Sequence, residues 1–377
     1  MAIQLFVPTY RVDECIEEIR QCLELGWTGI GFKTVEFESA WRAYTGHKHA
    51  HFVNSATAGL HLAVKILKQV HGWQDGDEIV STPLTFVSTN HAILYEKMKV
   101  VFADVDEHLC MDPEDLERRI GPRTRAVMFV GLGGNTGQYA DILAICRKHR
   151  LPLILDGAHM AGTRLHGEMP GKEADVAVYS FQAVKNLPTA DSGMICFADE
   201  EMDGICRKYT WLGINKDTYT RTHSAGNYKW KYDVEYLGYK YHGNSVMAAI
   251  GLVQLRYLDE DNRFRRQVAQ WYEDRLGHGS SRAKPIPVAA DCESSRHLFM
   301  IESGNRDELL HVLNDNEIYP GVHYRDNTDY AMYAYGQGTC PRAHDMSGRI
   351  LSLPMHLQLR EEDVDRVCEI VAAHAKE

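Results

Sequence analysis

The fold of this chain follows from Val176-Ala-Val-Tyr-Ser180-Phe-Gln-Ala-Val-Lys185, read together with Pro152-Leu-Ile-Leu-Asp156 upstream. Each stretch begins as a short apolar run, which predicts a buried strand. The first strand ends in an acid, and the second ends in a hydroxyl with a lysine shortly beyond it. In parallel α/β sheets, ligands gather at the carboxyl ends of the strands. We therefore expect Asp156, Ser180 and Lys185 to meet in one site.

Similar apolar runs recur on both sides of these two stretches. They lie at 78–81, 99–103, 125–130 and 194–197, and helical patterns separate most of them at 56–70, 84–97, 112–119 and 140–149. This alternation predicts a large α/β domain with a mainly parallel mixed sheet flanked by helices. Helical patterns at 11–25, 245–275 and from 361 complete the outline. We expect an N-terminal arm and large domain over 1–247 and a smaller C-terminal α+β domain over 248–377.

Composition narrows the classes of protein that the chain can belong to. The net charge of −11 argues against a nucleic-acid binder but leaves room for a basic pocket that holds a small anion. Nine cysteines without a CxxC pair predict reduced thiols, a cytoplasmic location and no structural zinc or disulfide framework. The N-terminus lacks the pattern of a signal peptide, and no apolar stretch is long enough to cross a membrane.

The residue types at the expected site point to pyridoxal 5'-phosphate (PLP) chemistry. An amine such as Lys185 forms the Schiff base, a carboxylate such as Asp156 keeps the pyridine nitrogen protonated, and the Ser180 hydroxyl meets the phosphate. Apolar and small neighbours predict a lowered pKa for Lys185. His159, in Asp156-Gly-Ala-His159, is placed to hydrogen-bond the phenolate of the cofactor or the acid. A metal site at Asp156 lacks enough further ligands.

Two further segments fit the same cofactor, each with an ordinary structural alternative. Ala56 and Thr57 follow Asn54-Ser55 at the expected start of a helix, where backbone N–H groups bind phosphate; the alternative is a plain Ser N-cap. Phe86, in Thr82-Pro-Leu-Thr-Phe86, would stack on a heterocyclic ring, or would be a core residue.

Two other motifs suggest different functions and are disfavoured. Gly131-Leu-Gly-Gly-Asn-Thr-Gly137 resembles a dinucleotide loop, but Thr136 stands where the pattern needs glycine, which weakens the case for a nicotinamide-dependent oxidoreductase. His47-Lys-His-Ala-His51 alternates as a strand does, and we expect a solvated strand face there rather than a metal site.

Residues 215–244 are rich in tyrosine, lysine and glycine and predict a long functional loop. Within it, Arg221 and Lys229 alternate with aromatic residues, a combination that suits a diphosphate beside a stackable base or sugar. The alternative is a solvated basic loop.

Taken in order, these motifs resemble the DegT/DnrJ/EryC1/StrS family of sugar aminotransferases, a branch of the fold-type I PLP enzymes. The resemblance runs over nearly the whole chain and is carried by Gly26-Trp-Thr28-Gly29, Asn54-Ser-Ala-Thr57-Ala58, Thr82-Pro-Leu-Thr-Phe86-Val, Phe102-Ala-Asp-Val-Asp106, Asp156-Gly-Ala-His159, Ser180-Phe-Gln-Ala-Val-Lys185-Asn186-Leu, Leu237-Gly-Tyr-Lys-Tyr241, Gly321-Val-His323-Tyr324 and Leu351-Ser-Leu-Pro-Met-His356.

The resemblance implies a role for each matching residue. Lys185 would form the internal aldimine and move protons, while His159 would lie near the phenolic oxygen. The other cofactor contacts that it implies are Asp156 at the pyridine nitrogen, Phe86 on the ring, and Ala56, Thr57 and Ser180 at the phosphate, with Lys240 reaching the phosphate of the partner in a homodimer. We predict substrate contacts at Thr28, Arg221, Lys229, His323 and Tyr324.

The chain departs from the family pattern at several positions. Lys240 stands where the family has Asn, His242 where it has Arg, and Gly131 begins a loop where a His-x-x-Gly sequence is common. The run after the lysine, Pro188-Thr-Ala-Asp191-Ser-Gly193, also differs from the usual Thr-Thr-Gly-Glu-Gly-Gly. Lys185 itself favours transamination, because the dehydratase branch of the family carries His there.

The resulting prediction is a PLP-dependent aminotransferase that moves an amino group from glutamate or glutamine to the ketone of a nucleotide-linked sugar. Two alternatives stay open at this point. One is an aminotransferase for a free keto-cyclitol or other small ketone, and the other is a non-catalytic PLP-binding regulator.

Overall fold

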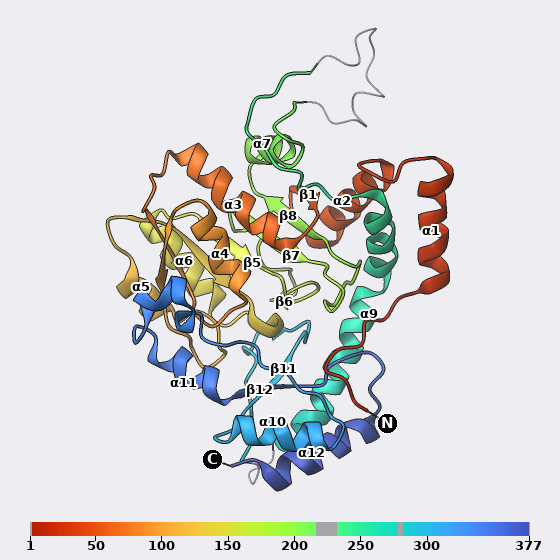
Figure 1. Ribbon diagram of the computed structural model, residues 1–377, viewed down its shortest axis with the longest axis vertical. Helices are drawn as coiled ribbons and strands as arrows, with labels where there is room; N and C mark the ends of the chain where they lie inside the picture. The colour runs from red at the N-terminus through yellow and green to blue at the C-terminus, as the bar shows by residue number, and fades with distance from the viewer. Residues whose placement is uncertain (1, 216–231, 278–281, 377) are drawn as a thin grey trace.

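The computed structural model describes residues 2–215, 232–277 and 282–376. Its centre is a seven-stranded sheet in the order β1-β8-β7-β5-β4-β2-β3 (Figure 1). The strands are β1 (His49–Val53), β2 (Glu78–Ser81), β3 (Lys99–Phe102), β4 (Thr124–Val130), β5 (Leu153–Asp156), β7 (Val176–Ser180) and β8 (Gly193–Phe197). The pairs from β3 through β7 are parallel, and β8 pairs antiparallel with β7 and β1. The predicted mainly parallel mixed sheet is therefore confirmed.

Helices cover both faces of this sheet, as the alternating pattern predicted (Figure 1). The helices in this part of the chain are α1 (Val12–Glu24), which packs against α9 (Ser245–Leu276), and α2 (Phe32–Thr45), α3 (Ala56–His71), α4 (Val87–Tyr95), α5 (Pro113–Arg119), α6 (Tyr139–His149) and α7 (Glu200–Thr210). Strand β7 explains why two layers are needed. Its Val176 and Val178 enter one hydrophobic cluster, while Ala177 and Tyr179 enter another on the opposite face. A strand buried on both sides has an unbroken apolar sequence.

A second, smaller sheet lies toward the C-terminus. It is antiparallel in the order β12-β11-β9, with β9 (Lys284–Pro285), β11 (Phe299–Glu302) and β12 (Ile350–Leu353). Helices α10 (Arg306–Asp315), α11 (Pro341–Arg349) and α12 (Glu361–His374) accompany it, and it shares a third hydrophobic cluster with the end of α9 (Ser245–Leu276).

The long helix α9 runs past both sheets (Figure 1). It packs against α1 and α2 and also against α12 and β9. In addition, β6 (Arg164–Leu165) pairs with β10 (Cys292–Glu293), so contacts cross the expected division at 247/248. That division into two domains stays a prediction.

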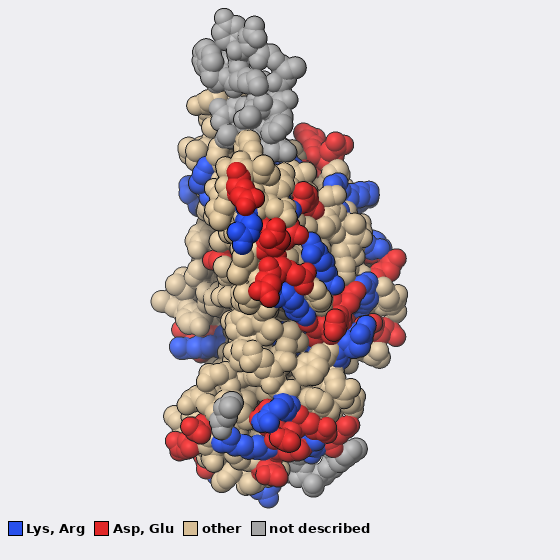
Figure 2. Space-filling view, turned by 90° about the vertical axis from the view of Figure 1, so that its right-hand side faces the viewer, with Lys and Arg blue, Asp and Glu red and all other residues tan. Residues whose placement is uncertain are grey.

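Charged side chains of both signs are interspersed over the face of the molecule in Figure 2. Many charged side chains of the described residues form ion pairs between elements, such as Lys33 with Glu18 at 2.6 Å and Arg256 with Glu18 at 2.7 Å. Among the described residues, no helix is both long and apolar enough to cross a membrane.

The expectation of a solvated histidine face on β1 is wrong. His47 and His51 are buried, at 7% and 8% exposure. His51 contacts Glu38 at 2.9 Å and Thr210 at 2.8 Å, and His47 contacts the Tyr179 hydroxyl at 2.9 Å. Packing of α2 and α7 against this edge of the sheet covers a strand face that alternation alone suggested was exposed.

Candidate active site

A cavity of about 350 Å³ opens at the carboxyl ends of the central strands. Nine of the residues that the sequence singled out line it: Ala56, Thr57, Phe86, Asp156, His159, Ser180, Lys185, His323 and Tyr324. The parallel register explains the meeting, because Val130 at the end of β4 pairs with Asp156 at the end of β5, which pairs with Val178 of β7. Residues from α3, α4 and the C-terminal part of the chain line the remaining sides.

Lys185 lies in the loop that follows β7. Its backbone N–H donates to the Gln182 carbonyl at 2.8 Å, and the Gln182 side chain accepts from the Val184 N–H at 3.0 Å. This tight turn directs the amine into the cavity. Burial lowers the pKa of Lys185 to about 8, an effect that Asp156 opposes. An amine with this pKa supplies a useful neutral fraction near neutral pH, which is what a nucleophile needs.

Asp156 ends β5 and is 3% exposed. Its Oδ2 accepts a hydrogen bond from the Thr89 hydroxyl at 2.7 Å, and its Oδ1 accepts one from the Ala158 N–H at 3.1 Å. Burial raises the pKa of this carboxyl group, while the two donors and Lys185 lower it. A buried carboxylate with lone pairs still available is suited to a cationic ring N–H.

The N-terminus of α3 forms another wall. Ser55 caps the helix by accepting a hydrogen bond from the Ala58 N–H at 3.1 Å, as the structural alternative predicted. The capped end of the helix also lines the cavity. Ser180 stands opposite, at the end of β7. The glycine at position 193 lets the start of α3 approach β8 closely, because a Cβ there would lie 2.8 Å from the Ala56 nitrogen. Helix N–H groups and a hydroxyl make this end an anion site.

The hydrogen bonds of His159 define the tautomer of its neutral ring. Its Nδ1 accepts from the Gly133 N–H at 3.1 Å, so in the neutral ring the proton sits on Nε2, which lies 3.1 Å from the Tyr324 hydroxyl. Burial, aided by Lys185 and His323, keeps the pKa of His159 well below its usual value. The glycine loop at 131–137, which resembled a dinucleotide site, here orients a histidine of the cavity.

Phe86 precedes α4 at the cavity mouth and is 55% exposed, which is too much for a core residue. Its ring centroid lies 5.8 Å from that of Tyr324. The turn that carries Phe86 is held by Asn327, which donates its side-chain amide to the Thr85 carbonyl at 2.8 Å and its backbone N–H to the Pro83 carbonyl at 2.9 Å.

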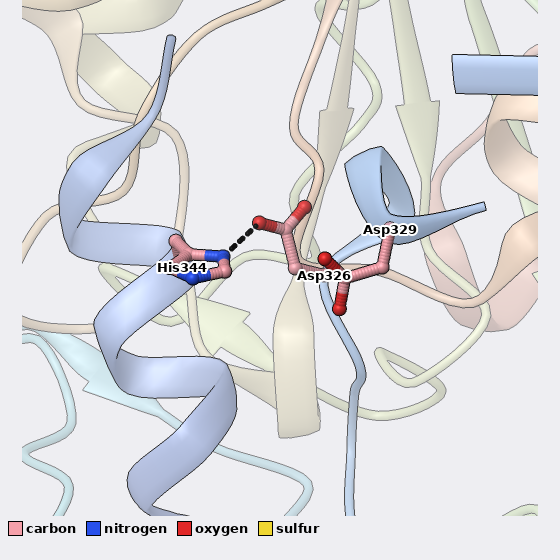
Figure 3. A group of neighbouring side chains, drawn as sticks. All are labelled: Asp326, Asp329 and His344. Atoms are coloured by element: carbon pink, nitrogen blue, oxygen red, sulfur yellow. Dashed lines mark hydrogen bonds and ion pairs between the residues drawn. The ribbon is translucent and has the colours of Figure 1, made fainter. Parts of the chain in front are cut away.

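An Asp-Asp-His group beside this turn has the composition of a metal site (Figure 3). The carboxylate of Asp326 is already engaged: Oδ1 accepts from the N–H and hydroxyl of Thr328, and Oδ2 contacts His344 at 3.0 Å. Asp329 pairs with Arg325 at 3.1 Å. The group therefore ties α11 to the segment that holds the Phe86 turn.

Several residues that line the cavity were given no role from the sequence, among them Phe6, Thr85, Gln182, Asp191 and His297. His297 lies far from Lys185 in the chain, yet its Nε2 is 3.4 Å from the Lys185 Nζ. No local motif marks it. Thr89, which contacts Asp156, had a weak signal in the sequence because it lies in the first turn of α4, three residues beyond Phe86.

Two of the remaining predicted residues, Thr28 and Lys240, are not part of the cavity lining in a single chain. Thr28 is exposed in the loop between α1 and α2. Lys240 is exposed, and its amine sits 3.2 Å from the centroid of the Trp211 ring. Arg221 and Lys229 lie outside the described residues.

The chemical groups that line the cavity are of the types that bind PLP. The cavity offers an amine of lowered pKa, a buried carboxylate, a helix N-terminus with a nearby hydroxyl and an aromatic ring at its mouth. When bound, this cofactor supplies an electron sink for bonds at an attached amine. Fold and site together define a PLP-dependent enzyme of fold type I.

Comparison with known proteins makes the assignment specific. Residues 10–372 match the model of the DegT/DnrJ/EryC1/StrS aminotransferase family, so the chain belongs to this family and is a PLP-dependent aminotransferase. The chain is 35% identical over 370 residues to the spore coat polysaccharide biosynthesis protein SpsC of Bacillus subtilis, covering 95% of this chain and 93% of that one.

Solved structures agree with this assignment over nearly the full length. The sugar aminotransferase CalS13 from Micromonospora echinospora is 28% identical with a TM-score of 0.89, covering 98% of this chain and 99% of that chain. Spr1654 from Streptococcus pneumoniae, solved in its PLP form, is 25% identical with a TM-score of 0.90, covering 99% and 98%.

Proposed function

We propose that this aminotransferase acts on a keto-sugar carried by a nucleotide, with glutamate or glutamine as the amino donor and Lys185 as the lysine that binds PLP. The observation that carries the proposal is the position of the Lys185 amine, inside the cavity that also contains Asp156 and the N-terminus of α3. Burial lowers the pKa of this amine to about 8, which favours attack on a carbonyl.

The proposal gives a role to each cavity residue that the sequence assigned to the cofactor. Asp156 pairs with the pyridine N–H, and its Thr89 and Ala158 donors hold the carboxylate in place. Ala56, Thr57 and Ser180 bind the phosphate. His159, as an N–H donor at Nε2, is suited to an anionic oxygen of the cofactor, and Phe86 covers the ring. Lys185 would take up and release the transferred proton at its Nζ.

The substrate class is supported by relatives and by composition. SpsC takes part in spore coat polysaccharide biosynthesis, and CalS13 is a sugar aminotransferase, so a sugar ketone is the natural acceptor. His323 and Tyr324 line the cavity and are proposed to contact this sugar, together with Thr28. Arg221 and Lys229 are proposed to bind the diphosphate of the nucleotide.

We also propose a cytoplasmic homodimer in which each protomer completes the site of the other. Leu237 is 94% exposed and Val234 is 63% exposed, in the same segment as Lys240. Apolar side chains this exposed are typical of an interface. In the dimer, Lys240 would reach the cofactor phosphate of the partner, with a cation in place of the amide that the family has there.

The direct test of the site is reduction of the PLP-loaded protein with borohydride, followed by peptide mapping. We expect the cofactor to be fixed to Lys185. A label on another lysine would refute the assignment, and Lys185→Ala provides the matched control because it should bind PLP without a reducible bond. A screen of keto-sugar nucleotides and free keto-cyclitols with glutamate, read by mass spectrometry, then separates the proposed acceptor from the small-ketone alternative.

A further inference from the structure

A chain of hydrogen bonds runs through the interior and ends at Lys185. The Asn262 side-chain amide donates to the Ala161 carbonyl at 2.9 Å, and its Oδ1 accepts from the Asn186 amide at 2.7 Å. The same Asn186 amide donates to the Ser295 carbonyl at 2.7 Å. The Asn186 Oδ1 lies 3.0 Å from the His297 Nδ1, and the His297 Nε2 lies 3.4 Å from the Lys185 Nζ.

The two backbone carbonyls determine the direction of every bond in this chain. A carbonyl only accepts, so the amide nitrogens of Asn262 and Asn186 must be the atoms that face Ala161 and Ser295. The oxygen of Asn186 then faces His297, whose Nδ1 must carry the proton. The neutral ring therefore presents the bare lone pair of Nε2 to the Lys185 amine.

His297 is held neutral and in place. It is 1% exposed, and Phe6 stacks on it with ring centroids 5.3 Å apart and planes within 4°. Burial and the neighbouring cations and imidazoles lower the pKa of His297 well below its usual value. The titratable groups that face His297 or Lys185 are Asp156, His159, Arg265 and His323.

His159 cannot take the same role. Its ring lies 4.4 Å from that of His297, but its Nδ1 accepts from the Gly133 N–H, so its Nε2 is a donor aimed at Tyr324. The Nε2 atoms of the two histidines therefore differ: that of His159 is a hydrogen-bond donor, and that of His297 is an acceptor. Among the residues that line the cavity, His297 is the one whose contact with the lysine amine is an acceptor of hydrogen bonds.

We propose that His297 is a positioning residue that accepts a hydrogen bond from the Lys185 amine whenever this amine is free of the cofactor. The inference deepens the proposed function and rests on Lys185 being the cofactor lysine. The amine is free while the amino group being transferred resides on the cofactor, so the contact belongs to that half of the reaction. A buried amine without an acceptor would lose stabilisation of its charged form.

The test uses the full chain loaded with pyridoxamine phosphate, in which Lys185 is free. Trace labelling with acetic anhydride across a pH series, read by mass spectrometry of the Lys185 peptide, reports the pKa of this one lysine. His297→Phe keeps a ring between Phe6 and His159 but removes the acceptor. Because the acceptor stabilises the ammonium more than the neutral amine, we expect the pKa of Lys185 to fall by about one pH unit.

His297→Gln is the conservative variant. Its amide can donate to the Asn186 Oδ1 and turn its oxygen to Lys185, so the pKa of Lys185 should stay near the wild-type value. His47→Phe, which removes another buried histidine outside the cavity, should also leave it unchanged. If His297→Phe does not fold, His297→Met serves as the apolar variant, since an unbranched side chain adapts to the space.

An unchanged Lys185 pKa in a folded apolar variant overturns the inference, as does an equal fall in the Gln variant. These outcomes are distinct from failure of the proposed function. Borohydride labelling of another lysine would refute the role of Lys185 in holding the cofactor, whereas an unchanged pKa with the cofactor on Lys185 would refute only the role of His297.

Discussion

The hydrogen bond from Thr89 to Asp156 offers a sharp test of how the protein keeps this carboxyl group ionised in the proposed cofactor site. The Thr89 hydroxyl lies 2.7 Å from Asp156 Oδ2, and the two side chains are 0% and 3% exposed. The Thr85 hydroxyl is 2.9 Å from that of Thr89. Since Thr89 has one proton and gives it to the carboxylate, Thr85 must donate to Thr89.

Thr89→Val removes the donor and keeps the shape of the side chain. A hydrogen bond to a charged group contributes about 1.5–3 kcal/mol, which corresponds to a rise of about one to two pH units in the pKa of Asp156. Burial already raises this pKa, so the variant brings it closer to working pH. Asp156 must be ionised to pair with a protonated pyridine nitrogen, so the affinity of the variant for PLP should fall relative to the wild type as the pH is lowered. The loss is limited to about tenfold to a hundredfold, the ratio that one to two pH units represent.

The assay is a titration of cofactor-free protein with PLP at several pH values, followed by visible absorbance. The loss of affinity in Thr89→Val should shrink as the pH rises, because the carboxylate ionises again. Thr89→Ser keeps the hydroxyl and should resemble the wild type, and Thr85→Val should have a much smaller effect because it does not touch Asp156. Identical pH profiles for Thr89→Val and the wild type would refute the reasoning.

Three further predictions concern other parts of the molecule. Burial alone would raise the pKa of Glu38, but Arg207, His51 and the Phe52 N–H lower it to about 2. A carboxyl group with a lowered pKa stabilises the folded state at pH values above its unfolded pKa, and this stabilisation is lost as the pH falls toward about 2. Glu38→Gln should therefore lower the free energy of unfolding by about 3 kcal/mol at pH 7 and by progressively less in acid, as measured by denaturant titration. For the shared site, mixing inactive Lys185→Ala with inactive Lys240→Glu protomers should restore part of the activity, and a chain that is monomeric at working concentration would contradict the proposed dimer. For the nucleotide, neutralising Arg221 and Lys229 should raise KM for the keto-sugar nucleotide and leave the glutamate half-reaction almost unchanged, whereas equal loss in both would indicate a defect in folding or cofactor binding.

Much of the site was predictable because its residues lie at strand and helix ends. Apolar runs mark buried strands, and the residue after such a run lies at the edge of a parallel sheet where ligands bind. Asp156, Ser180 and Lys185 were found in this way, and so was the phosphate end at Ala56. The cavity brings all of them together.

Sequence periodicity was less informative about which faces are covered. The helical pattern at 11–25 predicted α1 but did not show which of its side chains are covered: Val12 and Leu23 are 59% and 63% exposed, while Cys15 and Cys22 are buried. The histidines at 47, 49 and 51 alternate as a solvated face does, but packing of α2 and α7 against β1 leaves His47 and His51 buried. Burial depends on which neighbours arrive, and these come from distant parts of the chain.

The sequence by itself determined the α/β class, the family, the cofactor and the residues at the ends of strands, because each of these depends on local patterns and short spacings. Only the tertiary structure decided what surrounds those residues. It brought Thr89 to Asp156, Gly133 to His159, and His297 to Lys185. The protonation of each histidine then followed from a backbone N–H or an amide that approaches it from another element. Such contacts leave no periodic trace in the chain, because they are made by the packing of whole elements rather than by neighbours in sequence.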